Sequence, residues 1–202
     1  MDRLHIVGAA LTERAANNIR RNGIMATQKW DIDPVHSSIN FSVRHLMVSK
    51  VRGHFSKWSG SLEFDPSNPL TTKVDIQIDA SSIDTKDAQR DGHLKSGDFL
   101  ETEAHPHITF KGKSVEKKSG DEYKLLGDLT VHGTTLPVTL DAEYSGQAKD
   151  PWGGERIGFS AQTSINRKDF GLAWNQALET GGLLVGEKVD IQIELEAVKP
   201  KA

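Results

Sequence analysis

The sequence of 202 residues contains no cysteine. Disulfide bridges, thiolate metal sites and cysteine nucleophiles are therefore excluded. Because a chain without cysteine folds equally well in reducing and oxidising surroundings, this absence does not identify a compartment.

Neither sign of charge dominates the sequence, since 25 lysines and arginines face 28 aspartates and glutamates, for a net charge of −3. Nucleic-acid binding needs a basic stripe, so no nucleic-acid partner is expected. No apolar run reaches the roughly 18 residues that span a bilayer, and we expect no membrane span. The apolar patch at residues 6–11 is shorter than a signal-peptide core and follows an acidic residue, Asp2, so a cytoplasmic location is expected.

Motifs for nucleotide or acyl chemistry are also missing. The pairs Gly153-Gly154 and Gly181-Gly182 lack the lysine and hydroxyl residue of a phosphate loop. No serine lies in a nucleophile elbow. We therefore predict that the protein is not an enzyme, and we assign no catalytic residue and no cofactor.

The first 26 residues differ from the rest of the chain. Leu4, Val7, Leu11, Ala15 and Ile19 recur at helical spacing with arginines between them. We interpret residues 1–26 as an N-terminal extension that is disordered or forms a short helix, upstream of a domain at residues 27–202.

From Trp30 onward, apolar and polar residues alternate with a period of two, which is typical of half-buried strands. Turn residues such as Asp65-Pro66 and Trp152-Gly153-Gly154 separate the alternating segments. Eight strands are predicted, around residues 39–45, 62–64, 74–80, 108–110, 125–131, 136–144, 159–165 and 189–197.

The stretch at residues 82–100 breaks this alternation and predicts a short helical insertion, capped by Ser82 or Asp84. The predicted fold class is all-β and antiparallel, about eight strands with a helical insertion around residues 82–100. A closed barrel accounts for the uniformly apolar inward positions and leaves no free sheet edge. A β-sandwich is the alternative that the pattern leaves open.

Histidine is the remaining candidate for chemistry. His105 and His107 are two residues apart and would share one strand face, as a metal pair does, although Pro106 weakens a strand there. His36, His45, His54 and His93 converge only if the fold brings them together. No metal site is assigned, because histidines of intermediate burial are common without a metal. His45 continues an inward apolar row and would need a polar partner, such as a serine, a water or a ligand head group.

Several motifs together resemble the YceI-like family. They lie at residues 33–45, 51–55, 90–100, 105–110, 127–135, 166–172 and 185–189. The resemblance runs in order from Trp30 to about Val198. It departs from the family at Phe99-Leu100, where many members have two phenylalanines, and in the missing export signal of many relatives.

This resemblance implies a lipocalin-like barrel that binds, stores or transports a long-chain isoprenoid, isoprenoid quinone or fatty amide as its partner, with a homodimer expected. The alternatives are a histidine-based metal-dependent enzyme and a structural stress protein with a filled barrel. His45, Arg167 and Asp98 are candidates for a polar mouth. The candidate ligand-binding residues are Phe41, Val43, His45, Phe55, Leu94, Phe99, Phe110, Leu129, Leu140, Phe159, Arg167 and Phe170.

Overall fold

The described part of the chain folds into one antiparallel sheet of eleven strands. The computed structural model describes residues 27–46, 48–179 and 182–200. The extension predicted at residues 1–26 lies outside the described residues. The strands are β1 (Gln28–Ile32), β2 (Ser38–His45), β3 (Ser49–Phe55), β4 (Trp58–Phe64), β5 (Lys73–Asp79), β6 (Ile83–Asp84), β7 (His107–Ser119), β8 (Glu122–Val131), β9 (Thr134–Lys149), β10 (Glu155–Asn166) and β11 (Val185–Val198).

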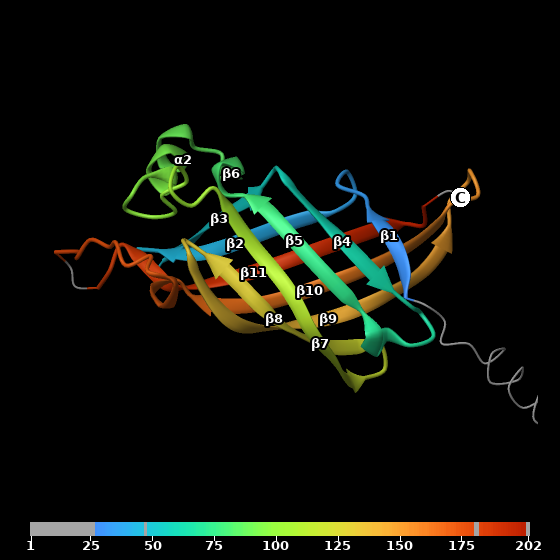
Figure 1. The fold of residues 1–202 in the computed structure, drawn as a ribbon. Helices are drawn as coiled ribbons and strands as arrows, with labels where there is room; N and C mark the ends of the chain where they lie inside the picture. The colour runs from blue at the N-terminus through green and yellow to red at the C-terminus, as the bar shows by residue number, and fades with distance from the viewer. Residues whose placement is uncertain (1–26, 47, 180–181, 201–202) are drawn as a thin grey trace, which may run out of the picture.

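The sheet closes into a barrel because β1 pairs with both β4 and β11. The closed ring runs β1-β4-β5-β7-β8-β9-β10-β11, and β2, β3 and β6 continue from β11 beyond the ring. The ribbon in Figure 1 shows these strands wrapping around a common axis. The predicted all-β antiparallel barrel of about eight strands is therefore confirmed, and the sandwich alternative is wrong.

Eight of the eleven strands coincide with the eight that alternation predicts. The additional strands are β1, β3 and β6. One of them, β1, replaces the predicted β2 as a member of the closed ring. The ring thus has the expected number of strands but not the expected set.

The predicted helical insertion contains an α-helix, α2 (Ala88–Lys95), preceded by a 3-10 turn, η2 (Ala80–Ser82), and the two-residue strand β6. The predicted cap is wrong. The side chain of Asp87 caps α2 by accepting hydrogen bonds from the backbone amides of Gln89 and Arg90. Asp84 instead accepts a bond from the amide of Lys86 in the turn before the helix.

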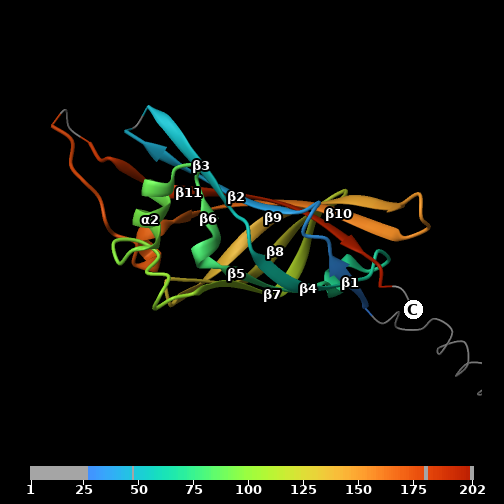
Figure 2. The ribbon, with the colours of Figure 1, turned by 90° about the horizontal axis from the view of Figure 1, so that it is seen from above.

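Two hydrophobic clusters divide the interior. The smaller, called here the basal cluster, consists of Trp30, Leu62, Phe64, Ile157 and Ala197. It lies where β1 joins β11, and the Trp30 indole donates a hydrogen bond to the Phe64 carbonyl at 3.1 Å. Seen from above, α2 and β6 lie at one end of the barrel and β1 at the other (Figure 2). The basal cluster therefore fills the end opposite α2.

The larger cluster surrounds the rest of the barrel axis and includes Ile78, Ile108, Phe110, Leu129 and Leu140. Its members come from neighbouring strands and occupy the inward positions of the alternating pattern. Within the ranges that the structure describes, no helix has the length and apolarity that crossing a membrane requires.

Candidate functional site

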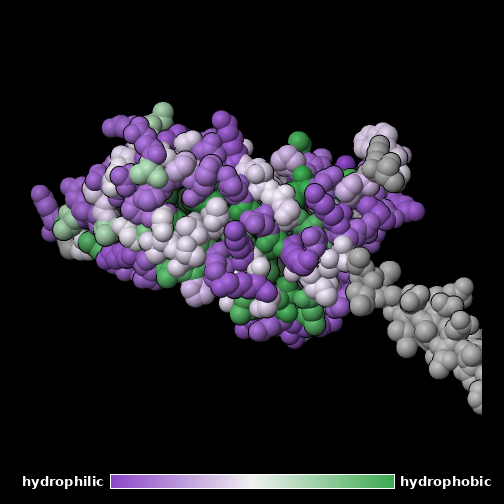
Figure 3. Space-filling view, viewed as in Figure 1, coloured by the Kyte–Doolittle hydropathy of each residue, from purple (hydrophilic) through white to green (hydrophobic). Residues whose placement is uncertain are grey.

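A cavity of about 710 Å³ lies inside the barrel. This volume falls within the roughly 300–1,000 Å³ of pockets that hold small molecules. In Figure 3 the face toward the viewer is mostly hydrophilic, and hydrophobic atoms are visible in the gaps between outer side chains. The cavity contradicts the filled-barrel alternative, because side chains fill only the basal end.

Glycines in the barrel wall help to keep this interior open. The ring of Phe110 on β7 lies across Gly127 on β8, where an added Cβ would come within 2.5 Å of Phe110 Cζ. The ring consequently lies along the wall, where glycine leaves room for close approach. The Phe110 ring thus adds aromatic surface to the wall without filling the centre of the cavity.

The deep end of the cavity rests on three aromatic rings. Phe64, from the basal cluster, makes an edge contact with Phe159, with ring centroids 4.9 Å apart, and contacts Tyr144 at 5.0 Å. Burial raises the pKa of the Tyr144 phenol above its ordinary value. The three rings therefore make this end of the cavity mainly apolar, which suits the end of a hydrocarbon chain.

Several polar groups of the lining lie at the α2 end. Asp87, Gln89, Arg90 and His93 come from α2 and its cap. His93 Nε2 lies 2.8 Å from Oδ2 of the exposed Asp98, which does not itself line the cavity. The cavity thus has charged and polar side chains from α2 at one end and a cluster of aromatic rings at the other, an arrangement that suits an amphiphile.

An aromatic bridge spans the same polar end. The Trp174 ring contacts His93 with centroids 4.8 Å apart and Phe99 at 5.2 Å. Trp174 belongs to the irregular segment between η3 (Arg167–Phe170) and β11. The bridge thus joins the α2 region to this segment above the cavity.

Arg167 fixes the two ends of that segment. It is only 3% exposed, and its guanidinium donates to the backbone carbonyls of Leu172, Val185 and Gly186. Burial lowers the pKa of Arg167. Arg167 lines the cavity, but at least three of its N–H groups are already engaged by the protein backbone.

The structure places eleven of the twelve candidate ligand-binding residues along the cavity. Phe170 is the exception, because it is 2% exposed and packs in the larger hydrophobic cluster without reaching the cavity. In this structure Phe170 therefore supports the core and does not form part of the cavity wall. The others line the wall: Phe41, Val43, His45, Phe55, Leu94, Phe99, Phe110, Leu129, Leu140, Phe159 and Arg167.

Sequence reasoning missed Trp58, Trp174 and Arg90, which also line the cavity. Trp174 lies in a segment without periodicity, so no pattern could assign it. Trp58 opens β4 and follows the inward parity of Leu62 and Phe64, which is a signal that a longer strand assignment would have used.

The alternative in which His105 and His107 form a metal pair on one strand face, to which no site was assigned, does not fit the fold. His107 begins β7 opposite Asp79, whereas His105 precedes the strand and packs on His132 with ring centroids 4.5 Å apart. Among the described residues, neither lining histidine, His45 or His93, belongs to a cluster of three metal-binding donors. The lining of the cavity is thus mainly apolar.

Known proteins resemble this chain over almost the whole described domain. Residues 30–197 match the YceI-like domain family. The Protein YceI of Escherichia coli O157:H7 is 42% identical over 180 residues, which cover 89% of this chain and 91% of that protein.

Solved structures agree with the fold. BcnA of Burkholderia cenocepacia superposes with a TM-score of 0.73 at 22% identity, covering 83% of this chain and 99% of that one. A polyisoprenoid-binding domain of Saccharophagus degradans superposes with a TM-score of 0.61 at 15% identity, covering 85% and 98%. At these identities the two likenesses concern the fold.

Proposed function

The chain belongs to the YceI-like family, and on this premise we propose that its barrel binds a long-chain isoprenoid or a similar amphiphilic lipid. The observation that carries the proposal is the cavity, with an apolar floor at Phe64 and Phe159 and polar groups at the α2 end. The structural neighbour that is a polyisoprenoid-binding domain supports the same class of ligand.

The energetics of such binding are favourable without a strong polar anchor. Burying about 400 Å² of ligand surface contributes on the order of 10 kcal/mol. Association and ordering costs remove several kcal/mol of this. The remainder corresponds to micromolar or tighter affinity.

The polar end supplies orientation. Arg90 and His93 line the cavity and are held by neighbours, Arg90 by Thr85 at 2.7 Å and His93 by Asp98 at 2.8 Å. A head group with hydrogen-bonding oxygen atoms, such as a quinone or an amide, would lie here, with its chain directed toward Phe159. Storage or transport follows if the lipid is later released. The homodimer and the cytoplasmic location stay predictions.

Mass spectrometry of an organic extract of the purified protein tests the proposal. We expect a co-purifying isoprenoid or long-chain amphiphile, or else uptake of an added isoprenoid quinone at one molecule per chain. A protein that is empty in native mass spectra and takes up none of the added quinone would refute it.

Neighbouring positions on β10 offer a matched pair of variants. Ala161 faces the cavity and Gln162 is exposed on the outer face. Ala161→Phe is expected to weaken quinone uptake by about tenfold or more, equivalent to about 1.4 kcal/mol, because the ring occupies the lumen. Gln162→Phe adds the same ring outside the barrel and should leave uptake unchanged.

A further inference from the structure

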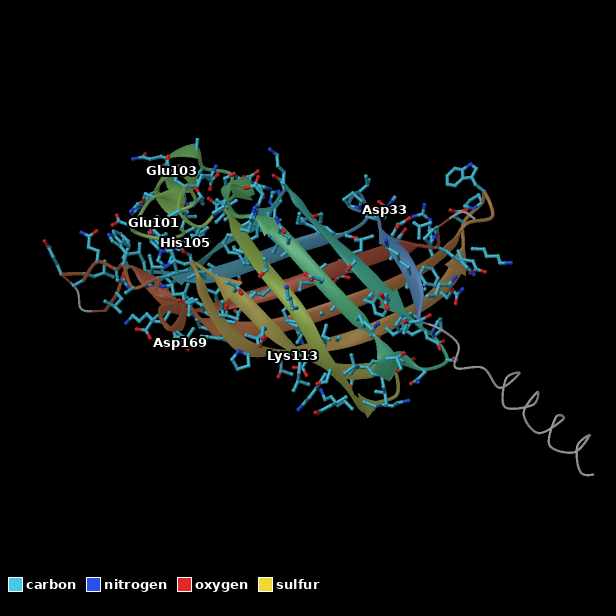
Figure 4. All side chains as sticks on the ribbon, viewed as in Figure 1. Asp33, Glu101, Glu103, His105, Lys113 and Asp169 are labelled. Atoms are coloured by element: carbon cyan, nitrogen blue, oxygen red, sulfur yellow. The ribbon has the colours of Figure 1, made fainter. Side chains whose placement is uncertain are left out.

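Three metal-binding side chains converge on the outside of the barrel, near its α2 end. Glu101 and His105 lie in the loop between α2 and β7, and His132 lies in the hairpin turn between β8 and β9. Figure 4 shows Glu101 and His105 close together at this end. None of the three lines the cavity, although Leu100 and Val131 beside them do. We call these three residues the donor cluster.

The distances within the donor cluster fit a tetrahedral ion. Glu101 Oε2 lies 3.3 Å from His132 Nε2 and 3.8 Å from His105 Nε2. All three donor atoms lie within 4.8 Å of one another. Tetrahedral zinc with bonds of about 2.0–2.1 Å requires donor separations of roughly 3.4 Å. Small side-chain rotations would therefore complete the geometry.

The backbone presents the three donors from fixed positions. The amide of His105 donates to the carbonyl of Glu101 at 2.8 Å, which places the two side chains four residues apart on one side of a turn. Four non-glycine residues of the described chain have positive φ, and two of them are Glu101 at 46° and His132 at 49°. A conformation that costs energy thus occurs at two of the three donors.

Gly133 completes the turn and makes space for the second imidazole. His132 and Gly133 both have positive φ, as the two central residues of a type I′ hairpin turn do. A Cβ at Gly133 would lie 2.8 Å from His105 Cε1. Only glycine at this position lets the His105 ring reach the hairpin.

A second group of donors on the barrel shows what a satisfied cluster looks like. Asp33, His36 and Glu196 also converge, but the guanidinium of Arg156 already binds both carboxylates. Glu101 differs, because its ion-pair partners within the described ranges are the two imidazoles alone. Within the described residues, no lysine or arginine forms an ion pair with the donor cluster.

We propose that Glu101, His105 and His132 bind one divalent transition-metal ion of the zinc class, with the fourth position left to water. Two imidazoles and one carboxylate suit zinc, whereas Mg²⁺ and Ca²⁺ prefer all-oxygen sites. The bound ion clamps the loop that carries Phe99 and Leu100 to the hairpin that carries Val131. This inference is independent of the lipid ligand.

Calorimetric titration of the untagged full chain with ZnCl₂, after treatment with a chelator, tests the site. One ion per chain is expected, with no binding of MgCl₂. His132→Asn, which tolerates the left-handed backbone, and Glu101→Gln should each weaken zinc binding by about tenfold or more, since losing even an outer partner of a zinc ligand costs roughly 10–100-fold. His107→Asn is the control, because His107 is exposed and outside the cluster.

A measurement on the unaltered protein removes any dependence on how the variants fold. Zinc should shift the imidazole NMR signals of His105 and His132 and leave those of His107 in place. Absence of zinc binding, equal binding by His132→Asn and Glu101→Gln, or a response of His107 in place of His105 and His132 would each overturn the proposal.

Discussion

Phe41 lies opposite Gly53 across the β2–β3 pair, and its ring covers the glycine so closely that an added Cβ would be 2.4 Å from Phe41 Cζ. The ring of Phe110 covers Gly127 in a similar way, although these two residues lie diagonally across the β7–β8 pair, where Phe110 is opposite Leu129. In both cases a glycine at an inward position receives the ring of the neighbouring strand. Cavity width therefore depends on residues that contribute no side chain to the lining.

Gly53→Ala is expected to narrow the cavity. The atoms that the new Cβ meets belong to the side chains of Phe41 and Thr85, so the Phe41 ring must move toward the lumen. We expect weaker uptake of a long isoprenoid quinone and a loss of about 1–3 kcal/mol of stability from overpacking.

Gly92→Ala is the matched control for this change. Gly92 lies in α2, and an added Cβ there meets nothing within 4 Å. This substitution should leave uptake unchanged and raise stability by up to about 1 kcal/mol, because alanine favours a helix. Equal uptake by Gly53→Ala and the unaltered protein would contradict the role given to this glycine.

Arg167→Met is expected to loosen the segment between η3 and β11. The buried guanidinium donates to three backbone carbonyls. Because the variant leaves these carbonyls without their donor, the free energy of unfolding should fall by about 2–4 kcal/mol. Hydrogen exchange at residues 173–179 and 182–184 should accelerate. Lys168→Met removes the neighbouring exposed cation, which pairs with Glu187, and should change little.

Removal of Arg156 should lower the thermal midpoint of unfolding. Its guanidinium binds Asp33 on the segment after β1, Asp150 in the β9–β10 turn and Glu196 on β11. Arg156→Met leaves three carboxylates close together without their cation. We expect that midpoint to rise again when salt screens the repulsion, a response that loss of packing alone would not give.

Acid should destabilise the barrel partly through Asp33. A hydrogen bond from His36 and a further bond from Arg156 hold the pKa of Asp33 at about 2, against the opposing effect of burial. Because the folded value lies below the unfolded value of about 3.9, the stabilisation is complete above about pH 4 and is lost as the pH falls toward 2.

Urea unfolding of Asp33→Asn checks this prediction. The variant should lose less stability than the unaltered protein between pH 5 and about pH 2. Asp31→Asn alters an exposed carboxylate on β1 and should retain the full acid dependence. An identical pH profile for Asp33→Asn and the unaltered protein would be the contrary result.

The alternation of apolar and polar residues predicted the strands that have one face in the interior and one in solvent, because their inward positions carry apolar side chains. It missed β3, where Gly53 interrupts the inward apolar row between Val51 and Phe55. It also missed β1, although Trp30 and Ile32 alternate with the polar Asp31 there. The cavity inside the barrel could not be predicted either. The glycines that make room for it appear in the sequence only as interruptions of the apolar alternation.

The candidate site was predictable where parity governs it and not where tertiary contacts do. Phe41, Leu129 and Phe159 follow from alternation, whereas Phe170 packs into the core from η3, which has no strand parity. The partner of His105 is His132, and only the fold brings these two distant histidines together. His107 is close to His105 in the sequence, but the two side chains lie in different places in the fold.

Closure of the ring depends on two residue pairs, Asp31 with Val198 and Ile32 with Ala197. Nearly all of the domain lies between these partners in the chain. During synthesis β1 cannot pair with β11 until β11 has been made, and until then the edge of β1 that faces β11 stays unpaired. Such a long-range pairing slows folding and exposes an intermediate to aggregation, so the moment of risk for this protein is its own translation.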